Sequence, residues 1–348
     1  MSQFVRKLLM SKTEQLLRRK DRKWRPEPES NRRARICSPL RNHSAIGPRP
    51  PFREGSGALA ILRRKGNRPV IPYVTSVWTH GRIGAMTLRM SIANLLDPIT
   101  AAGGDTRFSG LDHWMQGRTL YGGASALIAY TAVTRAFPDL PPLRGAQVAF
   151  VAPTGPEAEL RREIVRQGRN VAQVRSEIWC EGQCTLTAFW LFGTEREANA
   201  MHDAAPVADW PGPPEEAESA MHGKGPAFIQ NNFEIRRAQE QQGPGDPVVR
   251  RWARLTDREG LDPVSELILL GDVLPPGAMR AMKRQGPISS VNWSFNLLEP
   301  APATRDGWWM SENASQHAAH GYSSERLRLW NADGKQMLDG MQCVAVFG

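Results

Sequence analysis

The residue of this sequence best suited to chemistry is Asp272, a lone carboxylate inside the apolar run LILLGDVL at 267–274. Removing a carboxylate from water disfavours its charged form and raises its pKa toward neutrality. Such a group can take a proton from a water molecule near pH 7, which is the task of a general base. The plainer alternative is that Asp272 caps the end of a helix before the break PPG at 275–277.

The elements that must position Asp272 follow a pattern that occurs twice in the chain. A small-residue helix at 121–136 begins the first copy, and an apolar helix at 262–274 begins the second. One short and three longer strand patterns follow each helix. The predicted strands span 143–151, 157–167, 170–180 and 183–192 in the first copy, and 288–297, 308–317, 324–330 and 336–347 in the second. A period of about 150 residues indicates a duplicated domain and not a solenoid.

One helix followed by four strands predicts the α+β class, with an antiparallel sheet curved around one buried helix in each copy. Alternation supports the strands: Leu327 and Leu329 point one way, and the arginines between and beside them point the other. Both helices are nearly apolar all round, which fits burial in the concave face of a sheet. An open sheet edge is a liability unless it is paired, so we expect the two sheets to join edge to edge.

Short motifs in these elements resemble the acyl-CoA thioesterase II branch of the hot-dog superfamily. They are GRTLYGG at 117–123, RQGR at 166–169, LLGD at 269–272, SSVNWS at 289–294 and MQ at 341–342. The resemblance runs from about 92 to 347. It implies a tandem hot-dog fold, with two antiparallel sheets each wrapped around a central helix. It also implies hydrolysis of acyl-CoA to a free acid and CoA, an activity of lipid metabolism that needs no metal or other cofactor.

Carried over residue by residue, the resemblance implies that Asp272, Ser290 and Gln342 hold one water at the thioester carbonyl. Ser290 stands where the family more often has Thr, and it keeps the hydroxyl. Leu143 aligns with Ser290 in the first copy, so one site per chain is expected, built mainly from the second copy. Taken without the family, Ser290 also suits an ordinary strand position, and Gln342 suits a solvent-facing edge strand.

Two further groups of residues are candidates for contact with the substrate. Glycines allow close backbone approach, so amides near helix ends can donate hydrogen bonds to an oxyanion. The candidate oxyanion donors are the amides of Gly122, Gly123 and Gly271. The candidate ligands of the CoA phosphates are Arg166, Arg169 and Arg175. The alternative for the arginines is that they are solvated charges on a strand surface.

Charge separates residues 1–85 from the rest of the chain. The net charge is +10, yet residues 1–85 carry 20 Lys and Arg against 5 Asp and Glu, which leaves −5 for the remainder. A disordered or nucleic-acid-binding arm is one interpretation. However, ESNR at 29–32 and RICSPL at 35–40 can be encoded by the complements of a transfer-RNA T-arm and anticodon arm. We therefore expect synthesis to begin at Met86 or Met90.

The expected organisation is a disordered basic segment at 1–85, a first hot-dog domain at 90–200, a Pro- and Gly-rich linker at 201–226 and a second hot-dog domain at 227–348. Four cysteines without a CxxC pair, and no apolar run of about 18–20 residues, predict a cytoplasmic protein without membrane or nucleic-acid partners. Acyl-CoA is the expected partner, and a homo-oligomer of double hot-dogs is possible. The alternative functions are non-catalytic acyl-CoA binding and a hot-dog hydratase or dehydratase.

Overall fold

The computed structural model describes residues 91–208, 213–220, 225–240 and 243–347. These residues belong to one compact unit, Gly81–Gly348. The predicted basic segment at 1–85 and the candidate starts Met86 and Met90 lie outside the described residues. None of the described helices is long and apolar enough to cross a membrane.

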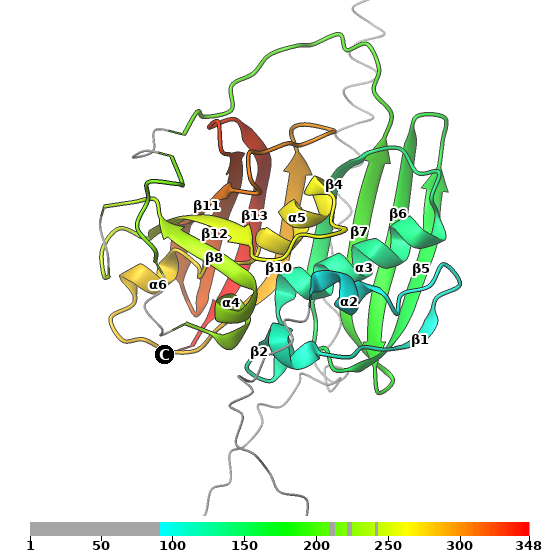
Figure 1. The fold of residues 1–348 in the computed structure, drawn as a ribbon, viewed down its shortest axis with the longest axis horizontal. Helices are drawn as coiled ribbons and strands as arrows, with labels where there is room; N and C mark the ends of the chain where they lie inside the picture. The colour runs from blue at the N-terminus through cyan, green and yellow to red at the C-terminus, as the bar shows by residue number, and fades with distance from the viewer. Residues whose placement is uncertain (1–90, 209–212, 221–224, 241–242, 348) are drawn as a thin grey trace, which may run out of the picture. The chain divides into compact units, whose positions relative to one another are not determined.

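One antiparallel sheet of eleven strands forms the framework of the unit (Figure 1). From edge to edge its strands are β1 (Gly104–Arg107), β5 (Glu157–Gln167), β6 (Val171–Cys180), β7 (Gln183–Gly193), β4 (Leu143–Phe150), β10 (Ile288–Leu297), β13 (Gln336–Val346), β12 (Tyr322–Asn331), β11 (Trp309–Ala319), β9 (Val248–Leu255) and β8 (Phe233–Arg237). A separate hairpin consists of β2 (Met115–Gln116) and β3 (Thr119–Leu120). The helices are α2 (Ile92–Leu96), η2 (Leu111–Trp114), α3 (Gly122–Ala136), α4 (Ala227–Asn232), α5 (Pro263–Leu270) and α6 (Ala278–Ala281).

The two halves of the sheet meet where β4 pairs with β10. This ladder runs from the pair Ala149 and Asn292 to the pair Gly145 and Asn296. The expected edge-to-edge junction is confirmed, and the two predicted sheets are one continuous sheet. Pairing β4 with β10 satisfies backbone groups that would otherwise lie on two open edges.

All eight predicted strands are present, and each ends within two residues of its predicted bounds. The structure adds β1 at one edge, and β8 and β9 at the other, none of which was predicted from the sequence. The sequence of β9, VVRRWARL, places two arginines side by side and so breaks the polar–apolar alternation of a half-buried strand.

Helix α3 packs across β5, β6 and β7, and all of its residues from Gly123 to Val133 are buried. Helix α5 lies beside α3, where the hydroxyl of Tyr121 donates a hydrogen bond to the carbonyl of Leu269. Gly123 permits this approach, because a Cβ there would lie 2.2 Å from the Leu269 carbonyl oxygen. The start of α3 and the end of α5 are therefore in direct contact.

The other face of the second half carries a smaller apolar cluster. Its members are Ala238, Trp252, Trp308, Met310 and Trp330. Part of the predicted linker covers it, since Ala208 and Ala217 pack against the cluster and the Trp330 indole donates to the Pro206 carbonyl at 2.8 Å. The predicted linker therefore contacts the sheet at Pro206, Ala208 and Ala217, while Trp210 lies outside the described residues.

Candidate active site

Asp272 lies in the turn after helix α5, and not within the helix as the sequence predicted. Helix α5 ends at Leu270, and Gly271 is its C-terminal cap. A Cβ on Gly271 would lie 2.2 Å from the indole of Trp293, so this turn packs too tightly against β10 to admit a side chain. The Gly271 amide donates to the Leu267 carbonyl at 3.0 Å and is not free to bind an oxyanion, contrary to the prediction.

The structure brings Asp272, Ser290 and Gln342 together. The Ser290 hydroxyl donates to Oδ1 of Asp272 at 3.3 Å, and Nε2 of Gln342 donates to the same oxygen at 3.2 Å. Nε2 of Gln342 also donates to the Ser290 hydroxyl. Gln342 is only 4 % exposed, which excludes the alternative of a solvent-facing side chain. Its Oε1 is buried and has no hydrogen-bond partner among the described residues.

A β-bulge at Val291 turns Ser290 toward Asp272. Trp293 of β10 is buried on the helix-facing side of the sheet, so strict alternation would turn Ser290 to the opposite side. The register between β10 and β13 shifts between Ser290 and Asn292, which makes Val291 the extra residue. An extra residue reverses the alternation, so Ser290 shares a face with Trp293 and reaches the carboxylate.

Burial raises the pKa of Asp272 from 3.8 to about 7, because the surrounding protein replaces the water that would stabilise the carboxylate. The hydrogen bonds from Ser290 and Gln342 lower the pKa, since they favour the charged form. The net direction agrees with the expectation from the apolar run around Asp272. A carboxyl group with this pKa exchanges protons readily near neutral pH.

The start of α3 faces the second oxygen of Asp272. A Cβ on Gly122 would lie 2.3 Å from Oδ2 of Asp272, so only a residue without a side chain fits there. Tyr121 is the N-cap residue and makes no side-chain capping hydrogen bond. The first amides of an α-helix have no partner within the helix. The amides of Gly122 and Gly123 therefore lie at an uncapped helix start beside the carboxylate.

A pocket of about 680 Å³ opens beside Asp272, a volume suited to a small-molecule ligand. Its apolar lining includes Phe150, Phe228, Ile229, Val273, Leu274 and Met279. Ser290 and Gly122 also line it. Arg118 lines the same pocket and was not singled out from the sequence, although it belongs to the motif GRTLYGG at 117–123.

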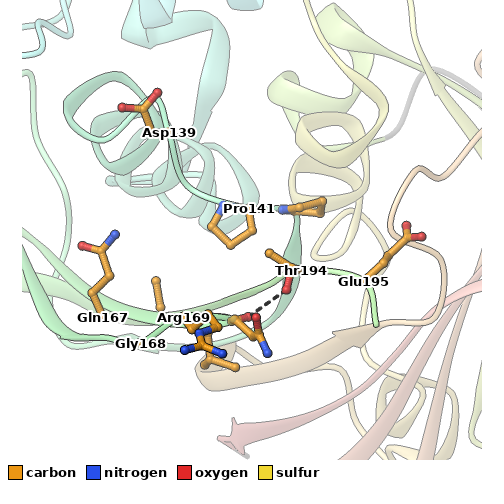
Figure 2. Close-up of a pocket in the computed structure, with 11 residues that line it drawn as sticks. Asp139, Pro141, Gln167, Gly168, Arg169, Thr194 and Glu195 are labelled. Carbon is orange, nitrogen blue, oxygen red and sulfur yellow. Dashed lines mark hydrogen bonds between the residues drawn. The ribbon is translucent and has the colours of Figure 1, made fainter. Parts of the chain in front are cut away.

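The arginines predicted to bind CoA phosphates lie elsewhere. Arg166 and Arg169 lie at the turn between β5 and β6. Thr185 lines the Asp272 pocket and lies on β7 beside the opposite end of β6. Figure 2 shows Arg169 at a separate pocket, together with Thr194 and Glu195. The fold therefore does not bring these two arginines to the Asp272 pocket.

Arg175 lies on β6 beside the fully buried Val174, so its side chain is on the sheet face that points away from α3. There it forms an ion pair with Glu163 at 2.8 Å and a longer one with Glu177 at 3.7 Å. This arrangement fits the alternative of a paired surface charge. Phosphate binding by Arg175 at the Asp272 pocket is not compatible with its position.

Solved structures show that this class of architecture is the hot-dog fold. A conserved hot-dog protein from Alicyclobacillus acidocaldarius has a TM-score of 0.65 at 19 % identity, over 74 % of this chain and 98 % of that chain. Acyl-CoA thioesterase II TesB2 from Mycobacterium marinum has a TM-score of 0.58 at 16 % identity, over 74 % and 98 %. The tesB protein of Mycobacterium avium subspecies paratuberculosis has 0.56 at 16 %, over 74 % and 100 %. Identities this low establish the fold alone.

Sequence models of a known family match both halves of the chain. The model of the acyl-CoA thioesterase N-terminal domain matches residues 111–193, and that of the C-terminal domain matches residues 202–346. The chain therefore belongs to the acyl-CoA thioesterase family, as its motifs predicted. No curated protein matches the sequence.

Proposed function

We propose that this protein hydrolyses acyl-CoA thioesters to the free acid and CoA. The observation that carries the proposal is the Asp272 carboxyl group with a pKa of about 7, held at one oxygen by Ser290 and Gln342 and facing Gly122 with the other. A thioester has a good leaving group, so its hydrolysis mainly needs an activated water and stabilisation of charge on the carbonyl oxygen. The family of the chain supports the same substrate class.

Asp272 acts as the general base in this proposal. A water beside the carboxylate gives a proton to Asp272 while its oxygen attacks the carbonyl carbon. Oε1 of Gln342 is a buried acceptor for the second proton of that water. Ser290 and Nε2 of Gln342 fix the orientation of the carboxylate through Oδ1. Both residues therefore position the water and the base without taking a proton.

The start of α3 stabilises the negative charge that forms on the carbonyl oxygen. A helix N-terminus carries partial positive charge and free amides, here those of Gly122 and Gly123. Collapse of the tetrahedral intermediate breaks the C–S bond and releases the CoA thiolate. The thiolate recovers the proton from Asp272, which regenerates the base. The water is divided between the two products, hydroxyl to the acid and hydrogen to the thiol.

A thiol-release assay across short, long, saturated and unsaturated acyl-CoAs tests the proposal. Hydrolysis frees one CoA thiol for each thioester consumed. A protein that only binds acyl-CoA would show saturable binding without thiol release, and a hydratase or dehydratase would alter the acyl chain and leave the thioester intact. Either outcome, obtained with the full set of substrates, would overturn the proposed function.

A further inference from the structure

Two of the described residues that line the Asp272 pocket have charged side chains. One is Asp272 itself, half-buried at the pocket wall, and the other is Arg118, which is exposed. The guanidinium of Arg118 forms no hydrogen bond or ion pair with any residue that the structure describes. Other arginines of the described chain, such as Arg161, Arg236 and Arg326, have carboxylate partners. Arg118 therefore offers an unused positive charge at the solvent side of the pocket.

The backbone holds Arg118 in this place. It lies in the turn of the β2–β3 hairpin, after Gly117, whose φ of 68° is a conformation that glycine adopts at little cost. The hairpin is fastened to the loop after β4, because the Leu120 amide donates to the Thr154 carbonyl at 3.2 Å and the Thr154 amide donates to Thr119 Oγ1 at 3.3 Å. The exposed position of Arg118 is thus built into the fold.

The short chain segment between Arg118 and Gly122 suits a substrate that the protein binds at both ends. Arg118 precedes Gly122 by four residues, and an extended chain of this length spans at most about 14 Å. Gly122 faces the Asp272 carboxylate, where the proposed mechanism places the thioester. The phosphates of CoA are joined to its thioester by the flexible pantetheine arm. One end of such a substrate can lie at Asp272 while the anionic end lies at Arg118.

We infer that Arg118 binds a phosphate group of the CoA portion of the substrate at the mouth of the Asp272 pocket. This inference rests on the proposed function and assigns the anion-binding role to a residue on the β2–β3 hairpin. A guanidinium binds phosphate oxygens through two parallel N–H donors, and an exposed Arg without a protein partner loses no ion pair when it does so. Arg118 is a binding residue in this assignment and takes no part in proton transfer.

Two substrates that share one acyl group separate phosphate binding from other roles. The first is the acyl-CoA, and the second is the N-acetylcysteamine thioester, which keeps the thioester and lacks every phosphate. For Arg118→Gln we expect KM for the acyl-CoA to rise roughly 10- to 100-fold, the range for losing a hydrogen bond to a charged group, with kcat little changed. We expect the N-acetylcysteamine thioester to be hydrolysed by the variant as it is by the wild type.

Two controls sharpen the measurement. Arg169→Gln removes a guanidinium of another exposed arginine, at the separate pocket of Figure 2, and should leave KM for acyl-CoA unchanged. Arg118→Lys keeps the charge without the two-donor geometry and should give an intermediate KM. Added salt should raise the wild-type KM for acyl-CoA and have little effect on that of Arg118→Gln, because salt screens an exposed ionic contact.

The outcomes distinguish this inference from the proposed function. Equal loss of both substrates in Arg118→Gln would show that Arg118 only supports the hairpin, and unchanged KM for acyl-CoA would show that it does not bind phosphate. Either result would overturn the inference and leave hydrolysis at Asp272 standing. A wild-type protein that hydrolyses neither thioester would overturn the proposed function, and the role of Arg118 with it.

Discussion

The two halves of the sheet share a backbone irregularity and differ in the side chains around it. In the first half the register of β4 against β7 shifts between Leu143 and Gly145. In the second half the register of β10 against β13 shifts between Ser290 and Asn292. The residue before each bulge is turned to the helix-facing side. It is a buried leucine in one half, and in the other it is a serine that donates to Asp272.

The neighbouring strands differ in the same way. Trp190 of β7 pairs with Ala146, and Gln342 of β13 pairs with Trp293, so Trp190 and Gln342 occupy equivalent places beside the two bulges. The Trp190 ring packs against that of Tyr130, with centroids 5.2 Å apart. In the first half, Leu143 and the Trp190 ring therefore occupy the places of the hydroxyl and the amide that hold the carboxylate in the second half.

The starts of the two helices complete the contrast. At α5, Asp262 accepts hydrogen bonds from the amides of Val264 and Ser265 at 2.9 and 3.1 Å. At α3, Tyr121 provides no such cap. The chain itself uses the first amides of α5, whereas those of α3 remain available to a ligand. A few side chains thus distinguish the half that carries the proposed site from the other half of the sheet.

The largest effect is expected for Asp272→Asn, which keeps the shape of the side chain and removes the base. The kcat for thiol release should fall by roughly 10²–10⁴, the range for loss of a general base. Asp262→Asn is the matched control, because asparagine caps a helix about as well as aspartate and this residue lies outside the proposed site. Near-wild-type turnover in Asp272→Asn, together with an essential residue in the first half, would show that the site lies in the first half and not beside Asp272.

A smaller loss, on the order of 10²-fold in kcat, is expected for Gly122→Ala. The added methyl group would lie 2.3 Å from Oδ2 of Asp272 and would displace either the carboxylate or the start of α3. Pro263→Ala changes the corresponding first residue of α5 and should leave kcat unchanged. If both variants retain full activity, the uncapped start of α3 has no part in catalysis.

Ser290→Ala and Gln342→Ala should each lower kcat by about tenfold, because each removes a hydrogen bond that orients the carboxylate and leaves the base in place. Adding either change to Asp272→Asn should cause little further loss, since all three residues act on one water. Leu143→Ala, at the place equivalent to Ser290, should leave kcat unchanged and lower the free energy of unfolding by about 2–5 kcal/mol. Additive losses in the double variants would show that the residues act separately.

Stability should depend on pH through Asp272 in a direction set by its raised pKa. The folded state favours the protonated carboxyl group of Asp272. The contribution of this group to the free energy of unfolding is therefore complete below about pH 4 and is lost as the pH rises toward about 7. Each pH unit in this window costs up to about 1.4 kcal/mol. Asp272→Asn should therefore be more stable than the wild type at pH 8, as measured by urea unfolding. Equal stability of the two proteins at pH 8 would show that burial of the charged Asp272 carboxylate does not destabilise the folded state.

The sequence predicted the strands, and which side chains meet at Asp272, better than it predicted the local backbone geometry. The predicted bounds of β5 and β10 match the structure, and the family motifs singled out Asp272, Ser290 and Gln342, whose side chains form hydrogen bonds with one another. The bulge at Val291 was not predictable, because strict alternation in ISSVNWSFNL turns Ser290 away from Trp293. The early end of α5 coincides with the close contact between Gly271 and Trp293, which lie on different elements.

The candidate phosphate ligands show a different limit of sequence analysis. Arg166 and Arg169 belong to a recognisable turn motif, yet the motif does not tell at which end of the sheet that turn lies. The direction of β6 carries it away from the Asp272 pocket. Arg118 lines the Asp272 pocket on a hairpin that is tied to Thr154 by hydrogen bonds between segments distant in sequence. Tertiary contacts of this kind have no local signal.

The pH dependence of kcat/KM for thiol release tests most directly whether Asp272 is the general base. We expect kcat/KM of the wild type to rise about tenfold per pH unit below about pH 7 and to level off above it, because only the deprotonated carboxylate can accept the proton of the water. The residual activity of Asp272→Asn should lack this step. A wild-type profile that is flat from about pH 5 to 8, or a step that persists in Asp272→Asn, would contradict the assignment.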